Sequence, residues 1–525
     1  MNKEINYNQE KKEFEIKKFD LSEHIHLKNF LIILLCFGIT FLFFLFCNPN
    51  SFLYVFNNNP DQNWYITMGE GMLAGKVPYK DLFEHKGPLV YFAYALVALF
   101  DNNYLGAFFF EIIFGVAFLY TAYKILKRYL SEKSSIVLLF LVAFLTFTSY
   151  YTLLGYGSVE FYSLPFLNYM LLAFLEFIED DKQFGIARSI GIGISISVLF
   201  WVKYTMLILP IAIMIMWIVM CIKNKNVKQM FKSIALMLAS FVVVTLPIII
   251  YYAVNDALYD LFYVYFYVNL FIYSGNPVNL GTNIWLMICL GNVNFIFMIL
   301  AEVFYFKMFG KKGYFILSAF LFSILLLMLQ DCHVNYYIIL LPFAVLGCAL
   351  LFKNLSKFKI KKLLGKELAI IMCIVVFPIG WAMSGVTREL GKSEEDYAQY
   401  QVAEDIHALS EQYNIDDPTM FCYKMYDYAF YNVAEIVPTE KFWVFNLFKN
   451  GIFPEMDNSL IESIESQSCD FVVVFTDVYE EEKDWLEQYY TVYDSYKSSY
   501  FRQNYTQNEL DVKLMISNNL INSQP

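Results

Sequence analysis

Long apolar stretches recur along the chain from Leu31 to Trp381. A lipid hydrocarbon core about 30 Å thick needs about 20 predominantly apolar residues in each crossing helix, and many of these stretches are close to that length. The composition agrees, because 58% of the 525 residues are hydrophobic and 17% are charged, against about 45–50% and about 25% in soluble domains. An ordinary cytosolic enzyme is excluded, and a multi-span membrane protein is predicted.

Eleven segments are predicted as transmembrane spans. The first, 29–47, lacks a small-residue cleavage site and is expected to remain as an uncleaved span. The other ten are 104–124, 134–152, 161–178, 186–202, 205–222, 233–252, 281–301, 314–330, 335–352 and 367–385. A further apolar stretch, 84–100, is short and carries Lys86, Gly87 and Pro88 near its start. We expect it to lie along the outer interface without crossing.

The basic residues predict the orientation, because Lys and Arg near short loops stay on the cytoplasmic side. With eleven spans and a cytoplasmic amino terminus, the cytoplasmic segments hold 25 of the 38 Lys and Arg, and the outer loops hold four. These cytoplasmic segments are 1–28, 124–133, 179–188, 222–232, 302–313 and 353–366. A crossing by 84–100 would place the later basic loops outside, which argues against it.

Three regions are predicted from this map. Residues 1–28 form a cytoplasmic segment, 29–389 form an all-α polytopic membrane domain with a long outer loop at 48–103, and 390–525 form an extracytoplasmic α/β domain. The last region differs sharply in charge, since residues 386–525 hold 9 Lys and Arg against 26 Asp and Glu.

Within the carboxyl-terminal region, apolar spacing predicts a helix at 397–413 and a second helix around Leu460 to Ile464. Short β-branched and aromatic runs at 419–423 and 471–475 predict strands, so the order suggests a small α/β layer. Cys422 and Cys469 fit two free buried thiols, and also fit a disulfide in an oxidising exterior. No Cys or His spacing in the chain suggests a metal site.

Ionisable residues outside the basic loops converge on the predicted outer face. Loop 48–103 holds three Lys, five acids and one His, which is too polar for a simple connector. The other outer groups are Glu160, Lys203, Asp331 and His333. Ionisable residues at membrane depth suggest function. A cavity with Lys86, Lys203 and His333 suits a lipid phosphate, and a carboxylate there can act as a general base.

Each of these residues also fits a structural role. The two lysines can extend to the interface from helix ends. Asp61 and Glu160 each lie where a helix start is predicted, and acids are favoured there. Asp331 and His333 also fit ordinary loop residues. Glu111 lies within a span, and we expect it to hydrogen-bond a neighbour in a structural role.

The first outer loop resembles that of bacterial C-type membrane glycosyltransferases, which are relatives of the protein O-mannosyltransferases and the lipid A aminoarabinose transferase. The resemblance rests on an Asp after the first span, a Gly-x-x-Pro-Tyr-x-Asp element and a Lys-Gly-Pro element, here Asp61, Gly75–Asp81 and Lys86–Pro88. It extends to Glu160, Lys203, the His333-x-x-Tyr336-Tyr337 element and Pro342. In one departure, Gln62 follows Asp61 where related enzymes often have Glu.

The resemblance implies an inverting transferase that moves a sugar from a polyprenyl-phosphate donor to a hydroxyl on the outer face of a bacterial cell membrane. The acceptor would be a glycan, a lipid or a protein. The implied catalytic residues are Asp61, as the base, and Glu160; the implied substrate-binding residues are Lys86, Lys203, His333, Tyr79 and Tyr336. This scheme requires no metal or other cofactor. No basic patch with interleaved aromatics points to nucleic acid.

The alternative is a multi-span lipid or glycan transporter, or flippase, without transfer chemistry. Such proteins commonly show inverted repeats and polar or broken spans at the middle of the bilayer. The sequence shows no repeat, and its polar groups concentrate at one face. This distribution favours the transferase.

Overall fold

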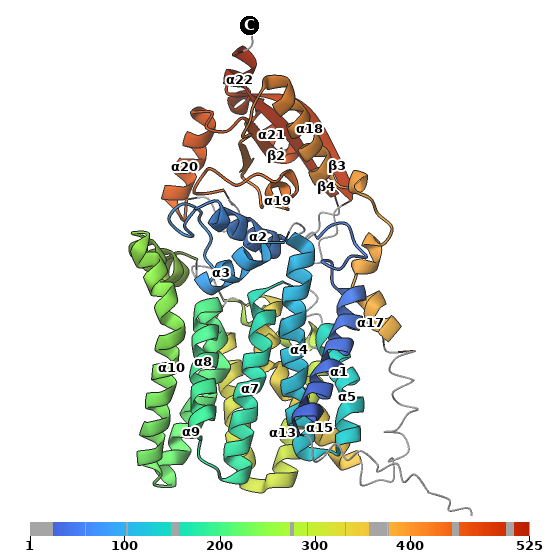
Figure 1. Cartoon of the computed structure of the whole chain (residues 1–525), viewed down its shortest axis with the longest axis vertical. Helices are drawn as coiled ribbons and strands as arrows, with labels where there is room; N and C mark the ends of the chain where they lie inside the picture. Colours follow the sequence, from blue (N-terminus) through green and yellow to red (C-terminus); the bar gives the residue numbers. More distant parts are fainter. Residues whose placement is uncertain are drawn as a thin grey trace, which may run out of the picture.

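The structure is a computed structural model that describes residues 25–57, 59–100, 103–148, 157–273, 278–290, 292–330, 332–355, 375, 377–443, 451–499 and 509–523. A bundle of long helices carries a smaller head domain on one end (Figure 1). Helices α2 (Pro60–Leu73) and α3 (Pro88–Val97) lie between the two parts. The first outer loop therefore forms the layer that joins bundle and head.

The bundle is built from helices of 15 to 28 residues. They are α1 (Ile25–Cys47), α4 (Asn103–Tyr129), α5 (Glu132–Phe147), α7 (Val159–Asp180), α8 (Ile186–Lys203), α9 (Ile208–Lys223), α10 (Val227–Val254), α13 (Asn292–Phe309), α14 (Gly313–Met328) and α15 (Leu341–Leu355). Shorter pieces extend or connect them: η1 (Tyr204–Leu207), α12 (Leu280–Trp285), η4 (Leu286–Leu290), η5 (Gly310–Lys312), η6 (Val334–Leu340) and α17 (Phe377–Met383).

Seven helical segments of the described chain are long and apolar enough to cross a membrane. Two of them, 186–223 and 293–328, each contain two consecutive helices, α8 with α9 and α13 with α14. The multi-span helical domain is confirmed, but the predicted number of eleven spans is not. The predicted span 134–152 corresponds to the 16-residue α5, and nearly half of 367–385 lies outside the described residues.

The segment 84–100 does not form a span. Its helix α3 has ten residues, or about 15 Å of length, which is half of the hydrocarbon thickness. Pro88 occupies the first turn, where its missing N–H costs nothing. The expectation that this segment does not cross is therefore confirmed.

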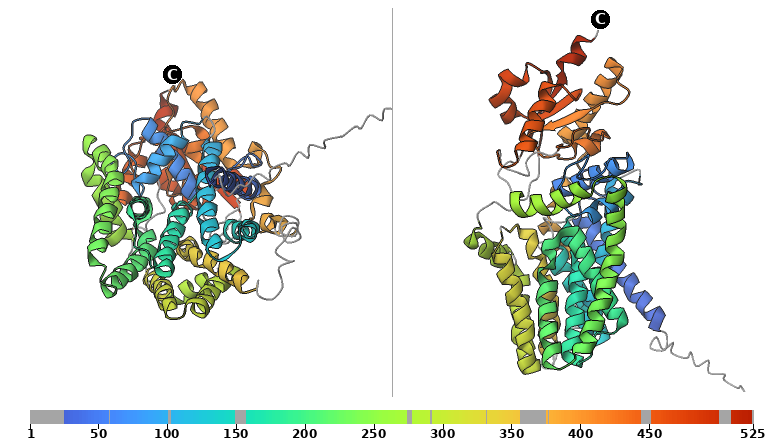
Figure 2. Two further views of the ribbon diagram at one scale, coloured as in Figure 1. Left: turned by 60° about the horizontal axis from the view of Figure 1, so that its bottom comes forward. Right: turned by 90° about the vertical axis from the view of Figure 1, so that its left-hand side faces the viewer.

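An unpredicted helix lies across the same end of the bundle. It consists of α11 (Leu258–Phe262) and the π-helix η2 (Tyr263–Ile272), which follow α10 (Figure 2, right). Its 15 residues are mostly apolar and aromatic but too few for a span, so the sequence analysis placed them in a loop between two predicted spans.

The head domain contains a four-stranded sheet in the order β1-β2-β4-β3. Its elements are α18 (Ala398–Tyr413), β1 (Met420–Tyr423), α19 (Phe430–Ala434), α20 (Pro454–Glu465), β2 (Phe471–Phe475), α21 (Thr476–Leu486), β3 (Tyr490–Ser499), β4 (Glu509–Ser517) and α22 (Asn518–Asn522). Strands β1 and β2 are parallel, with Cys422 opposite Val473, whereas β4 is antiparallel to both β2 and β3. Short one-turn 3₁₀ helices at Val386–Glu389 and Glu394–Asp396 precede α18.

The predicted helices at 397–413 and around Leu460, and the strands at 419–423 and 471–475, are confirmed. The hairpin of β3 and β4 was not predicted, although the alternation of polar and apolar residues in β4 is typical of a strand with one buried face. Cys422 and Cys469 are free and buried.

The head domain rests directly on the first outer loop. Trp64 of α2 stacks on Tyr426, with ring centroids 5.2 Å apart. Phe83 packs on Phe442, and its backbone N–H donates to the Lys441 carbonyl oxygen over 2.8 Å. The head domain therefore helps to hold the loop that carries the candidate site.

The end of the bundle away from the head carries many of the basic residues, including Arg128 at the end of α4, which pairs with Glu179 at the end of α7. We predict that this end is cytoplasmic and the head is outside. In a Cys289→Ser background, which removes an exposed thiol, a membrane-impermeant maleimide should label Ser466→Cys in intact cells. It should label Lys311→Cys only after lysis. The reverse pattern would invert the orientation.

Candidate active site

The start of α2 presents the first predicted catalytic residue. Asn59 is the N-cap, Pro60 begins the helix, and Asp61 lies in its first turn, half-buried. The alternative that Asp61 caps the helix is therefore wrong. Among the described residues, none donates a hydrogen bond to the Asp61 carboxylate or forms an ion pair with it.

The Gly75–Asp81 element forms a tight turn after α2. The Asp81 carboxylate accepts the Val77 backbone N–H over 2.7 Å, and the Tyr79 N–H donates to the Leu82 carbonyl oxygen over 2.8 Å. The Tyr79 side chain is fully buried, and its hydroxyl donates to the carbonyl oxygen of Lys86 over 2.5 Å. Tyr79 thus supports the backbone that carries Lys86.

Gly87 brings the Lys-Gly-Pro element against the end of α8. Its backbone N–H donates to the Val202 carbonyl oxygen over 3.1 Å. A Cβ at Gly87 would lie 2.0 Å from the Trp201 carbonyl oxygen, so only glycine allows this approach. Because Lys86 precedes this contact and Lys203 follows it, two lysines 117 positions apart in sequence are brought together.

Each lysine is associated with a buried glutamate. Lys86 Nζ lies 3.6 Å from Glu84 Oε1, and Glu84 Oε2 accepts the Lys86 backbone N–H over 2.9 Å. Lys203 Nζ lies 2.5 Å from Glu160 Oε1 and 3.7 Å from the ring centroid of Tyr336. Charges buried in this way need close partners to offset their lost hydration.

The electrostatics show that these groups lie close to one another. Burial alone would lower the pKa of the Lys86 ammonium, but the carboxylates of Asp61, Glu84 and Glu160 outweigh burial and raise it. Burial also lowers the pKa of His85 well below its usual value, and the charges of Lys86 and Lys203 lower it further. Lys86 is therefore a cation and His85 a neutral ring near neutral pH.

We call Asp61, Glu84, Lys86, Glu160 and Lys203 the charged cluster. Glu160 enters it from the first turn of α7, where the Ser158 hydroxyl caps the helix by accepting the Phe161 N–H over 3.2 Å. Only one oxygen of Glu160 is engaged by Lys203; the other is buried and has no hydrogen-bond partner within the described chain.

Other predicted residues lie around this cluster. Tyr336 contacts Lys203 directly, and His333 is exposed, with its ring 5.8 Å from that of Tyr336. Asp331 lies outside the described residues. No group of three or more His, Cys, Asp or Glu side chains in the described chain is arranged to hold a metal ion.

Sequence reasoning missed the contribution of η2. Asn269 of this helix donates to the His85 carbonyl oxygen over 2.7 Å, and the Tyr273 ring packs on His85 at 4.5 Å. A lone Asn in an aromatic run was a usable signal, because an amide that is partly removed from water needs a hydrogen-bond partner. Helix η2 thus helps to hold the loop that carries Lys86 in place through its contacts with His85.

Comparison with known proteins identifies the fold. Residues 85–251, from the start of the Lys86 loop to α10, match the family model for dolichyl-phosphate-mannose-protein mannosyltransferase. ArnT from Cupriavidus metallidurans in the apo state aligns with 96% of this chain and 100% of its own, with a TM-score of 0.61 and 10% identity. The chain has the fold of the C-type membrane glycosyltransferases.

Two further solved structures share this C-type fold. ArnT bound to undecaprenyl phosphate aligns with 94% of this chain and 98% of its own, with a TM-score of 0.59 and 9% identity. The archaeal oligosaccharyltransferase AglB from Archaeoglobus fulgidus, in complex with an inhibitory peptide and a dolichol-phosphate, aligns with 95% of this chain and 77% of its own, with a TM-score of 0.55 and 13% identity. No curated protein sequence matches the chain. The resemblance predicted from the first outer loop is confirmed.

The close approach at Gly87 predicts that an added methyl group lowers the stability of the protein there but not at Gly38. Gly87→Ala should lower the stability of the detergent-solubilised protein by about 1–3 kcal/mol, because the new Cβ overlaps backbone that cannot move freely. Gly38→Ala in α1 is the matched control, since nothing lies within 4 Å of its added Cβ, and it should be neutral or stabilising. Equal melting temperatures for the two variants would contradict this packing.

Proposed function

We propose that the chain is an inverting glycosyltransferase that moves a sugar from a polyprenyl-phosphate donor to an acceptor hydroxyl. The observation that carries the proposal is the charged cluster, in which the Asp61 carboxylate, without a hydrogen bond in the described chain, acts on the Lys86 ammonium, and Lys86 in turn acts on Lys203. The reaction would take place at the head-facing end of the bundle, on the outer face of a bacterial cell membrane. The acceptor would be a glycan, a lipid or a protein.

Asp61 is the proposed general base. Its carboxylate is half-buried and accepts no hydrogen bond within the described chain, so it is available to take a proton from an incoming hydroxyl. As that oxygen attacks the anomeric carbon from one face, the lipid phosphate leaves from the other. A single displacement of this kind inverts the anomeric configuration.

Lys86 and Lys203 are the proposed phosphate ligands. In the leaving step, negative charge builds on the phosphate, and two ammonium groups held in place before the reaction would stabilise it. Charge-assisted hydrogen bonds to phosphate are among the stronger ones in proteins. Tyr336 helps to fix the Lys203 ammonium through its ring face. His333, exposed beside Tyr336, is proposed to contact the donor at the edge of the site.

Glu160 is proposed as the second catalytic carboxylate. One of its oxygens holds Lys203, and the other has no donor within the described chain, which leaves it able to accept a hydrogen bond from a sugar or acceptor hydroxyl. Tyr79 would assist donor binding indirectly, through its hydrogen bond to the backbone of Lys86.

The comparisons support the lipid-linked donor. ArnT has been solved with undecaprenyl phosphate and AglB with a dolichol-phosphate, and both share the fold. The alternative of a transporter or flippase lacks a comparable structural argument, because the charged cluster lies at one end of the bundle beneath the head.

The test uses membranes supplied with undecaprenyl phosphate that carries a radiolabelled hexose or pentose. Asp61→Asn should lose transfer by on the order of 10²-fold or more, because the proton acceptor is removed. Its binding of undecaprenyl phosphate should be unchanged. Lys86→Ala should weaken both binding and transfer, since its charge faces the phosphate throughout the reaction.

Lys80→Ala is the matched control, because Lys80 lies on the same loop but is exposed, and its ammonium donates to the Asn255 carbonyl oxygen, away from the charged cluster. It should behave as the unaltered protein. Full transfer by a well-expressed Asp61→Asn variant would refute the catalytic assignment and favour the transporter.

A further inference from the structure

Gln62, the residue after Asp61, is held by a saturated hydrogen-bond network. Its Nε2 donates to Glu111 Oε1 and to the Tyr94 hydroxyl, each over 2.9 Å. Its Oε1 accepts from Asn50 Nδ2 over 2.8 Å and from Asn57 Nδ2 over 2.6 Å. An amide side chain has two N–H donors and two lone pairs. All four are used, and the side chain is fully buried.

Glu111 is the acceptor at the centre of this network. It lies in α4, is fully buried, and accepts from three side-chain amides, those of Gln62, Asn48 and Asn50. No Lys, Arg or His of the described chain forms an ion pair with it. A carboxylate is held here by neutral donors alone, and an ionised carboxylate accepts at both oxygens without presenting a donor of its own.

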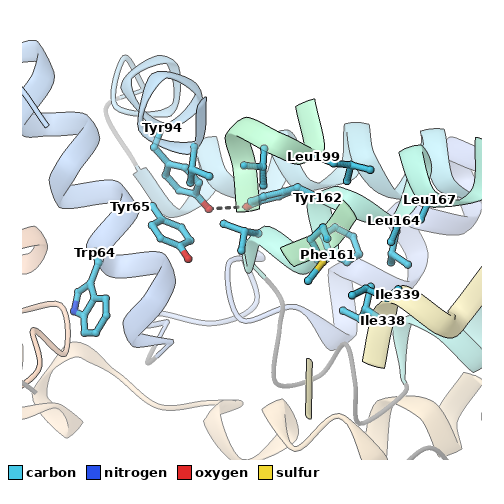
Figure 3. Close-up of a cluster of buried hydrophobic side chains, with 14 of the residues drawn as sticks. Trp64, Tyr65, Tyr94, Phe161, Tyr162, Leu164, Leu167, Leu199, Ile338 and Ile339 are labelled. Carbon is cyan, nitrogen blue, oxygen red and sulfur yellow. Dashed lines mark hydrogen bonds between the residues drawn. The ribbon is translucent and has the colours of Figure 1, made fainter. Parts of the chain in front are cut away.

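The same network touches the other helices of the site. A Cβ at Gly157 would lie 2.2 Å from the Gln62 side-chain carbon Cδ, so the chain just before α7 is packed against this amide. Tyr94 of α3 bonds Tyr162 of α7 through their hydroxyls over 2.6 Å (Figure 3). The network thus joins the starts of α2 and α7, which carry Asp61 and Glu160, to helix α3, which follows Lys86.

We propose that Gln62 and Glu111 act as a coupled pair of positioning residues that fix the direction of the Asp61 carboxylate relative to Glu160. The proposal rests on the proposed function, in which Asp61 is the base. Both side chains are fully buried, so they would act through the position of α2 and not through contact with the substrate. Their contribution is that the first turn of α2 cannot rotate or shift without breaking several buried hydrogen bonds at once, which are costly to leave unmade.

The chemistry of the pair predicts a rescue. In Glu111→Gln, the new amide places an N–H₂ against Gln62, Asn48 or Asn50, so donors face donors. In Gln62→Glu, two carboxylates face each other. In the double variant Gln62→Glu/Glu111→Gln, the carboxylate at position 62 accepts from Asn50, Asn57, Tyr94 and the new amide at position 111, whose carbonyl accepts from Asn48. The swap therefore restores the pattern with the acid and amide exchanged.

Two measurements on the purified full chain test the pair. The first is amide hydrogen exchange in residues 61–66, which needs no activity. Exchange should become faster in each single variant and return to the original rate in the swap. The second is turnover with the radiolabelled donor. Glu111→Gln should lower kcat on the order of 10²-fold with little change in KM, because small misplacement of a base is costly, and the swap should recover most of it.

Glu302→Gln is the matched control, since Glu302 is also buried in a bundle helix, in the part of α13 near the basic end. It should change neither amide exchange in residues 61–66 nor kcat. Unchanged exchange in Glu111→Gln, or a swap as impaired as the single variants, would overturn the positioning role. If Asp61→Asn keeps full transfer, the proposed function fails. The hydrogen-exchange data then decide by themselves whether Gln62 and Glu111 hold the start of α2 in place.

Discussion

The candidate site depends on one close contact between backbones. Gly87 lies against the end of α8, with its N–H on the Val202 carbonyl oxygen and no room for a Cβ beside Trp201. This contact brings Lys86 of the first outer loop next to Lys203 of the bundle. The supports on either side, Tyr79 beneath Lys86 and Asn269 on His85, hold the loop in that position.

The second constraint is the balance of buried charge. Two lysines with side chains 11% and 14% exposed are each accompanied by a nearly inaccessible glutamate. Such pairs lose much of their hydration and are rarely a net source of stability. In the proposed function, their value is that the ammonium groups are already desolvated and oriented, so an arriving phosphate would meet fixed cations with little reorganisation left to perform. Asp61, which accepts no hydrogen bond in the described chain, would be the base of the same reaction.

The sequence predicted much of this arrangement because charges are conspicuous in an apolar chain. Asp61, Lys86, Glu160 and Lys203 were selected as charges on the predicted outer face and through the family resemblance of the first outer loop, and the structure brings them together. Their common location follows from topology, since Glu160 and Lys203 lie at the head-facing ends of α7 and α8, and Asp61 and Lys86 lie in the first outer loop on the same side. The predicted head helix at 397–413 and strands at 419–423 and 471–475 also had clear local patterns.

Contacts that depend on the packing of distant segments could not be predicted from the sequence. Nothing near Gly87 indicates that its partner is Trp201, because that contact exists only once α3 and α8 are placed side by side. Glu111 was expected to play a structural role, yet its partner Gln62 is 49 positions away. The number of spans could not be read reliably either, because apolar length alone does not show where a helix breaks, as between α12 and α13.

The most direct test of the central claim is an experimental structure of the chain with undecaprenyl phosphate bound. The account predicts the phosphate oxygens within hydrogen-bond distance of both Lys86 Nζ and Lys203 Nζ, with the Asp61 carboxylate facing the position of the sugar carbon. A phosphate bound away from both lysines, for example at Arg128 on the opposite end of the bundle, would contradict it.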